Sequence, residues 1–220
     1  MDHMMLEKMA AFFEARLEGY DTHMLNNIEG AAAFYPFTAD CLPKATDAAI
    51  LDLGCGTGLG LEWYFSLNPT ATVTGIDLSE GMLRALKEKF RDKALKLIYG
   101  SYFDVPFGCG VYDAAVSVES LHHFTKQEKI PLYTKLHGAL KERGFFILTD
   151  YFALSDEEER GFQEELLRLK EENGIADTEF YHYDTPLTVA HETEALVAAG
   201  FQKVEVLQNW GATYTLRAMK

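Results

Sequence analysis

The sequence predicts an α/β fold built on a doubly wound sheet of seven strands, mostly parallel, with an antiparallel strand near the C-terminus. Two observations predict it. Short apolar runs of strand length alternate with helical patterns over residues 46–220, which is typical of parallel strands covered by helices on both faces. The first run, Ala49–Leu53, also leads directly into a series of closely spaced glycines, as at a strand-to-helix turn of such a sheet.

Residues 1–45 precede this alternation and are expected to form a helical cover. Apolar residues recur at helical spacing from Leu6 to Leu17, and Gly19 ends that helix. A second apolar segment, residues 31–42, is interrupted by Pro36. The apolar face of this region must be buried against the rest of the chain.

The remaining elements follow in order along residues 46–220. The seven strands are expected at Ala49–Leu53, Thr72–Ile76, Leu95–Tyr99, Tyr112–Val118, Phe145–Tyr151, Lys203–Leu207 and Thr213–Met219. The last two are joined by "QNWG" and form an antiparallel pair that closes the sheet. Helices are expected at Leu59–Leu67, from Ser79 to about Phe90, from Thr125 to Leu140, from Ser155 to about Glu172, and at Pro186–Ala199.

Three of these helices carry recognisable start signals. Ser79 is an N-cap, Thr125 with Glu128 forms a capping box, and Ser155 with Glu158 caps the long acidic helix. That acidic helix lies in an expected helical insertion at about residues 152–185.

Charge and cysteine content exclude some classes of function. The chain of 220 residues has a formal net charge of −14, which repels nucleic-acid phosphates. It lacks an apolar run of about 18 residues, so no membrane span is expected, and its N-terminus carries no secretory signal. Cys41, Cys55 and Cys109 are widely spaced and odd in number, as expected of free thiols in the cytoplasm. The oligomeric state stays open.

The glycines at positions 54, 56, 58 and 60 predict a ligand at the end of the first strand. Glycine lets the backbone approach a ligand closely, and the free N–H groups of the following helix face the same place. A dinucleotide fingerprint requires a third glycine where this chain has Leu59. Asp77, at the end of the second strand, can accept both hydroxyls of a ribose. The ligand is therefore expected to carry a nucleoside.

Five segments in order resemble the motifs of class I S-adenosylmethionine-dependent methyltransferases. They are "ILDLGCGTG", "GIDLSEGML", "YGSYFDVPF", "YDAAVSVESLHHF" and "LKERGFFILTDY", and they span residues 50–151. The resemblance implies a Rossmann-like fold with S-adenosylmethionine as cofactor. It places the methionine part of the cofactor at the glycine loop, the ribose at the acid after the second strand, and the adenine after the third strand.

Carried over to this chain, these roles fall on a defined set of residues. The cofactor-binding set is Tyr20, Asp52, Gly54, Cys55, Gly56, Gly58, Asp77, Leu78, Ser101, Tyr102 and Val118. One position departs from the family pattern, because Ser101 stands where members often have an acid that reads the adenine; Asp104 is a weaker substitute. Cys55 is expected to be a small packed residue rather than a reactive thiol.

The candidate catalytic residues are Glu119, His122 and His123, directly after the fourth strand. A histidine or glutamate there can take the proton of an acceptor, and His123 is slightly favoured because imidazole titrates near neutral pH. The spacing resembles an E-x-x-E-H segment of some metal-dependent members, with His122 in place of the second acid. Packing and capping of the strand end explain the pair without an ion, so no metal is expected.

Two segments outside the core are expected to close the site. The "YD" pair, Tyr20 and Asp21, resembles the cover of small-molecule methyltransferases, so residues 1–42 are predicted to order around the cofactor. Residues 181–183, two tyrosines flanking a histidine, either line the acceptor pocket or face solvent.

The sequence thus predicts S-adenosylmethionine-dependent methyl transfer to a small-molecule acceptor, with no nucleic-acid or membrane partner. Three alternatives stay open: a cofactor-binding regulatory module without catalysis, an enzyme that modifies the cofactor itself, and a dinucleotide dehydrogenase, which the missing third glycine disfavours. Neither the acceptor nor its methylated atom can be identified from the sequence.

Overall fold

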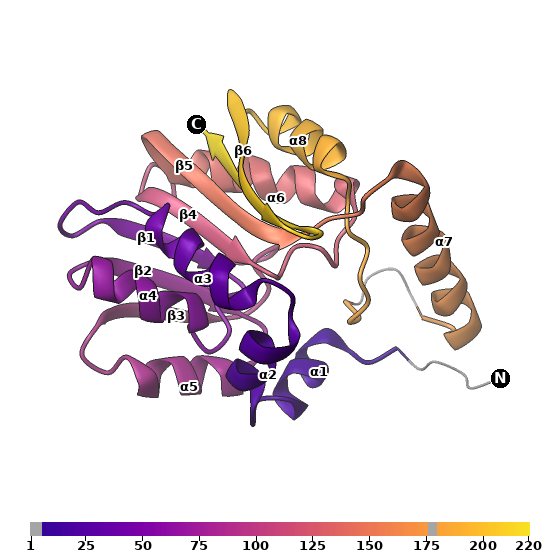
Figure 1. The fold of residues 1–220 in the computed structure, drawn as a ribbon, viewed down its shortest axis with the longest axis horizontal. Helices are drawn as coiled ribbons and strands as arrows, with labels where there is room; N and C mark the ends of the chain where they lie inside the picture. The colour runs from indigo at the N-terminus through magenta and orange to yellow at the C-terminus, as the bar shows by residue number, and fades with distance from the viewer. Residues whose placement is uncertain (1–5, 176–179) are drawn as a thin grey trace.

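A seven-stranded sheet in the order β3-β2-β1-β4-β5-β7-β6 forms the centre of the computed structural model, which describes residues 6–175 and 180–220 (Figure 1). Strands β1 to β5 are parallel, and β7 runs antiparallel to both of its neighbours. The predicted fold is confirmed. The strands are β1 (Ala49–Leu53), β2 (Thr72–Asp77), β3 (Ala94–Tyr99), β4 (Tyr112–Val118), β5 (Leu140–Tyr151), β6 (Lys203–Trp210) and β7 (Thr213–Met219).

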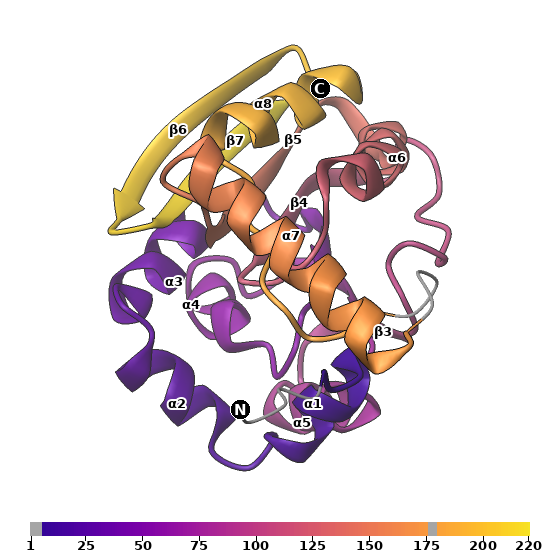
Figure 2. The same ribbon diagram turned by 90° about the vertical axis from the view of Figure 1, so that its right-hand side faces the viewer.

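Helices cover both faces of the sheet (Figures 1 and 2). On one face lie α3 (Ala31–Asp40), α4 (Leu59–Leu67) and α5 (Glu80–Lys89); on the other lie α6 (Lys126–Ala139) and α8 (Val189–Ala198). Alternation along β1 explains the two layers, because Ile50 packs toward the first set and Leu51 and Leu53 pack toward the second. All three side chains are fully buried, as expected of a central parallel strand.

The predicted helix starts are confirmed. The Ser79 hydroxyl accepts a hydrogen bond from the N–H of Met82 at 3.1 Å, and Thr125 with Glu128 forms a complete capping box. Ser155 likewise caps α7 (Asp156–Asn173) by accepting from the N–H of Glu158. These caps satisfy N–H groups that have no partner within the helix.

Several element boundaries differ from the sequence-based prediction. Strand β5 begins at Leu140, because Leu140 pairs with Tyr112 across an irregular register. Strand β6 continues through "QNW" to Trp210, so the turn falls on Gly211. Pro36 lies inside α3 rather than ending it, because that helix is anchored by buried side chains on both sides of the proline.

The N-terminal helices lie beyond the carboxyl ends of the strands, as Figure 1 shows. Helix α1 (Met9–Ala15) is shorter than the predicted apolar stripe and is followed by α2 (Tyr20–Asn27). The segment after α7 is joined to them, because the N–H of Met9 donates to the Phe180 carbonyl and the N–H of His182 to that of Glu7. Residues 1–5 of the expected cover and 176–179 of the expected insertion lie outside the described residues.

Among the described helices, none combines the length and the apolar character needed to cross a membrane.

Candidate active site

The glycine loop between β1 and α4 is shaped by positions that reject a side chain. Gly54 has a φ of 71°, and a Cβ there would lie 2.1 Å from the Ser120 hydroxyl oxygen. Gly58 has a φ of 73°, and its Cβ would lie 2.9 Å from Leu86. Gly60, in contrast, lies in the first turn of α4 with room against Tyr35. The backbone conformation of the loop therefore depends on the first glycines and not on Gly60.

Asp77 connects this loop to the start of α5. One carboxylate oxygen accepts from the N–H of Gly56 at 2.8 Å and the other from the N–H of Ser79 at 2.8 Å. Burial raises the pKa of Asp77, whereas these backbone hydrogen bonds act in the opposite direction. Each oxygen keeps a further lone pair for a ligand, so two ribose hydroxyls remain acceptable partners.

Most of the predicted cofactor residues line two small pockets over the loop. Asp52 and Cys55 line one, Asp77, Leu78 and Tyr102 line the other, and both pockets are lined by Tyr20, Gly54, Gly56 and Val118. The Cys55 sulfur packs toward Gly75, where a Cβ would approach it to 2.7 Å, as expected of a packed residue. Gly58 and Ser101 line neither pocket; the Ser101 hydroxyl instead accepts from the N–H of Phe103 at 3.2 Å.

Asp52 lines the first pocket and is buried. Burial, with the nearby charge of Asp77, raises the pKa of Asp52 to about 7. A cationic group of a ligand placed beside Asp52 would favour its ionised form and release a proton on binding.

The two pockets are nearly closed by the N-terminal helices. Their volumes are about 40 and 50 Å³, against roughly 300 Å³ or more for typical cofactor sites. Met9, Phe13 and Tyr20 cover the second pocket. A nucleoside is larger than either pocket, so its entry requires covering side chains such as Phe13 and Tyr20 to move.

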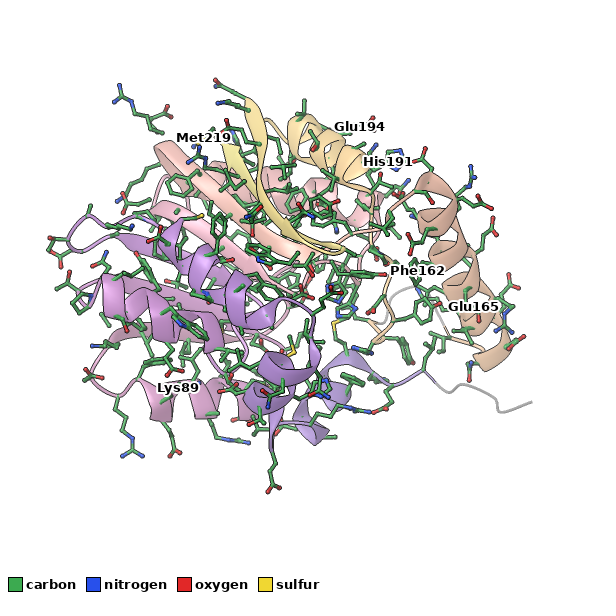
Figure 3. The ribbon with its side chains drawn as sticks, viewed as in Figure 1. Lys89, Phe162, Glu165, His191, Glu194 and Met219 are labelled. Carbon is green, nitrogen blue, oxygen red and sulfur yellow. The ribbon has the colours of Figure 1, made fainter. Side chains whose placement is uncertain are left out.

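Two carboxylates attach these helices to the loops beneath them. Asp21 accepts from the Thr57 hydroxyl and pairs with Lys89 at 2.6 Å; Lys89, on α5, is labelled in Figure 3. Glu14 of α1 accepts from the Ser79 hydroxyl at 2.6 Å and from the N–H of Gly81 at 3.0 Å. These contacts are partly exposed, so they are weak enough to open.

A larger cavity of about 800 Å³ opens beside the cofactor loop. Phe12, Phe13, Met24, Ile28 and Trp210 supply an apolar wall to it. Its polar wall includes all three predicted catalytic residues, together with Asp184 and His182. Sites with this mixture of apolar wall and a few convergent polar groups are typical of small-molecule binding.

Glu119 lies where the two spaces meet, because it lines both the larger cavity and the second cofactor pocket. Its φ of 49° is unusual for a residue other than glycine, and its N–H donates to the carbonyl of Thr149. Burial and the nearby carboxylate of Asp150 raise the pKa of Glu119 to about 7. The hydroxyl of Thr213 donates to its Oε1 at 3.2 Å.

The two histidines are held by carboxylates from distant segments. The Nδ1 of His122 lies 2.5 Å from Asp150, whose other oxygen accepts from the N–H of Leu121 at 2.8 Å. The other ring nitrogen of His122 lies 3.5 Å from Asp184. The Nδ1 of His123 lies 3.1 Å from the same Asp184 oxygen.

These surroundings give the two imidazoles different charge states at neutral pH. Burial alone would lower the pKa of His122, but the carboxylates of Asp150, Asp184 and Glu119 raise it to about 9. Burial and the charge of His122 lower the pKa of His123. At neutral pH His122 is therefore protonated and His123 is neutral.

A sequence profile described as "Methyltransferase domain" matches residues 50–144, the part of the chain that carries the glycine loop, Asp77 and the candidate catalytic residues. Over these residues the chain resembles a methyltransferase domain, which supports the predicted class I S-adenosylmethionine-dependent family and its cofactor.

Several known proteins resemble this chain. Protein W of a phycocyanin operon in Pseudanabaena tenuis, itself uncharacterised, is 49% identical over 57 residues, which are 26% of this chain and 54% of that protein. Demethylmenaquinone methyltransferase from Staphylococcus aureus is 28% identical over 186 residues, covering 67% of this chain and 75% of that protein. The chain thus spans only about half of the first relative's length.

A solved structure from Nostoc punctiforme, described as an O-methyltransferase, is similar with a TM-score of 0.73 and 22% identity. It covers 97% of this chain, and the match extends over 62% of the Nostoc chain. At this identity the likeness shows a shared fold.

Two carboxylates of the candidate site were not predicted from the sequence. Asp150 is the penultimate residue of β5, the strand beside β4, so the adjacency of two parallel carboxyl ends was a signal that could have pointed to it. Asp184 follows the three residues considered as a pocket wall but has no local signal of its own. His182, in contrast, belongs to the three residues that were expected either to line the acceptor pocket or to face solvent; it lines the cavity and stacks on Phe12 with a ring distance of 3.5 Å.

Proposed function

We propose that this methyltransferase transfers the methyl group of S-adenosylmethionine to a hydroxyl or amine of a small, largely apolar molecule bound in the 800 Å³ cavity. The observation that carries the proposal is the position of Glu119, which borders both the cofactor pocket and the cavity. A proton acceptor at that junction faces the point where cofactor and acceptor must meet.

The residues of the chain supply alignment and a base. When bound, the cofactor supplies a methyl group already activated by its sulfonium. Holding the acceptor in line with that group lowers the barrier by roughly 7–11 kcal/mol. Glu119 takes the proton that the acceptor loses, and its pKa of about 7 suits a base at neutral pH. Phe13 and Tyr20 of the cover exclude water from the junction.

With this assignment Glu119 replaces His123 as the preferred base among the three candidate catalytic residues. His123 lines the cavity but not the cofactor pockets, and its Nδ1 is directed at Asp184. His122 is protonated at neutral pH and therefore lacks a free lone pair for a proton. Both histidines shape the acceptor end of the site, and Glu119 is the base.

Charge and shape support a small acceptor over nucleic acid. The net charge of −14 opposes a phosphate backbone, and the cavity wall contains several acidic side chains, among them Glu18, Glu29 and Asp184. The resemblance to demethylmenaquinone methyltransferase supports an apolar ring compound. The three cysteines are free, which supports a reducing compartment such as the cytoplasm.

The test is a screen with methyl-labelled cofactor against phenols, quinols, hydroxy acids and aromatic amines, with each product identified by mass. We expect label in one chemical class and none in tRNA. Asp77→Ala is the matched control, because loss of charged hydrogen bonds of about 1.5–3 kcal/mol each should weaken cofactor binding in calorimetry. Transfer to tRNA alone, or turnover of the cofactor without any acceptor, would contradict the proposal.

A further inference from the structure

We propose that His122, His123 and Asp184 bind one divalent transition-metal ion at the wall of the acceptor cavity. The ligand atoms are the Nε2 of His122, the Nδ1 of His123 and a carboxylate oxygen of Asp184. This site goes beyond the proposed methyl transfer, since the ion can bind whether or not the cofactor is present.

The spacing of the three ligand atoms fits a single ion. The Asp184 oxygen lies 3.5 Å from the His122 nitrogen and 3.1 Å from the His123 nitrogen, and all three atoms lie within 4.8 Å of one another. Ligands that share an ion at bond lengths of about 2.1 Å are separated by roughly 3.0–3.4 Å in octahedral or tetrahedral geometry. An ion can therefore bind here with only small side-chain shifts.

The carboxylate of Asp150 holds His122 in an orientation suited to a metal ligand. The Nδ1 of His122 faces Asp150 at 2.5 Å, which leaves Nε2 for the ion once the ion displaces the proton that this ring carries at neutral pH. Asp150 is itself fixed by the N–H of Leu121 and is almost fully buried. A carboxylate on the second ring nitrogen sets the tautomer and orients the ring of metal ligands.

Charge and access also favour a cation. The ion pairs that the structure shows for Asp150 and Asp184 are all with imidazoles, and Glu119 adds a third carboxylate nearby. The Asp184 side chain is 43% exposed, so ions and acceptors reach the site from the cavity. Two imidazoles with one carboxylate favour zinc, cobalt, iron or manganese over magnesium or calcium.

Three protein ligands leave coordination positions that face the acceptor cavity. An acceptor oxygen bound there would be oriented, and its proton would be lost more easily to a base such as Glu119. The competing explanation is a hydrogen-bonded cluster, in which the His123 Nδ1–H is shared between Asp184 and the carbonyl of Tyr183 at 3.2 Å.

The test uses the untagged chain of 220 residues, stripped with chelator and titrated with Co²⁺ in the absence of cofactor and acceptor. We expect one Co²⁺ per chain by calorimetry and elemental analysis, visible absorption bands of a nitrogen- and oxygen-ligated ion, and displacement by Zn²⁺. Absence of stoichiometric Co²⁺ binding at concentrations up to about a millimolar overturns the proposal, as does equally tight binding of Mg²⁺.

Three variants locate the ion. Asp184→Asn and His123→Gln should each weaken Co²⁺ binding at least tenfold, and Asp150→Asn about 10- to 100-fold through its effect on His122. His191→Gln is the matched control: His191, labelled in Figure 3, also has its Nδ1 beside a carboxylate, Glu159 at 2.9 Å, but belongs to neither candidate ligand group.

Asp184 is half-exposed, so its variant should fold, and thermal unfolding checks each protein. Binding unchanged in both Asp184→Asn and His123→Gln overturns the assignment. Since no step requires methyl transfer, failure of the acceptor screen leaves this result unaffected.

Discussion

The two halves of the site lie at the same edge of the sheet but are built in different ways. At the ends of β1 and β2, backbone groups form the cofactor loop, and Asp77 fixes two of their N–H groups. At the ends of β4 and β5, side chains form the acceptor wall, with Glu119, His122 and Asp150 converging from two strands. Backbone recognition suits a cofactor common to a family, whereas side chains adapt to one acceptor.

The two halves of the site also differ in the volume that is open to a ligand. The pockets over the glycine loop hold about 40 and 50 Å³, whereas the acceptor cavity holds about 800 Å³. Side chains of α1 and α2 line all of these spaces: Tyr20 reaches each of them, and Phe12, Phe13 and Met24 form part of the cavity wall. Opening of the cover is therefore expected to affect both halves, whereas changes in charged side chains should act mainly on the acceptor half.

The largest effect is expected on the acceptor half, from Glu119→Gln. Once an acceptor is found, turnover at saturating cofactor should fall about 10²- to 10⁴-fold with cofactor affinity retained, because the base is lost. Wild-type turnover should rise from about pH 6 to about pH 8, since the pKa of Glu119 is raised to about 7 and only its ionised form accepts a proton. The variant should show no such rise.

Thr213→Val provides the control for this pH dependence. The Thr213 hydroxyl donates to Glu119 and favours its ionised form, so removing it should shift the turnover profile to higher pH. If Glu119→Gln keeps wild-type turnover at every pH, Glu119 is not the base.

A smaller effect is expected on the cofactor half, from Gly54→Ala. The new Cβ would lie 2.1 Å from the Ser120 hydroxyl oxygen, and the left-handed backbone adds strain. Together these costs should weaken cofactor binding in calorimetry by about 100-fold. Gly60→Ala is the matched control and should change affinity little, because its Cβ would meet Tyr35 at an ordinary 3.5 Å. Equal losses in both variants would contradict this account of the loop.

The smallest effect is expected at the contact between the cover and the loop. Backbone hydrogen exchange in α1 and α2 should slow when cofactor is added, measured against α8 as an internal reference. In the free protein, Asp21→Ala removes the partner of Thr57 and Lys89 and should speed exchange in α2 by up to about fivefold. Identical exchange with and without cofactor would argue that the cover is a fixed part of the fold.

The sequence by itself determined the sheet and the cofactor half. Alternating apolar runs fix which segments are strands, and the left-handed positions Gly54 and Gly58 reject other side chains, so these features appear as local patterns. Asp77 was predicted in the same way, because it lies at the end of β2. The caps at Ser79 and Thr125 are equally local, since each bonds a backbone group a few residues away.

Only the tertiary structure decided the acceptor half. Asp150 and Asp184 meet His122 and His123 across long stretches of chain, and no sequence pattern records which carboxylate faces which imidazole. The same contacts set the charge states on which the proposal of Glu119, rather than His123, as the base depends. The ends of some elements were also decided by the tertiary structure. Strand β6, for example, continues to Trp210 because β7 offers backbone pairing partners for it. The physical reason is that pairing, burial and pKa depend on neighbours in space, which the fold supplies.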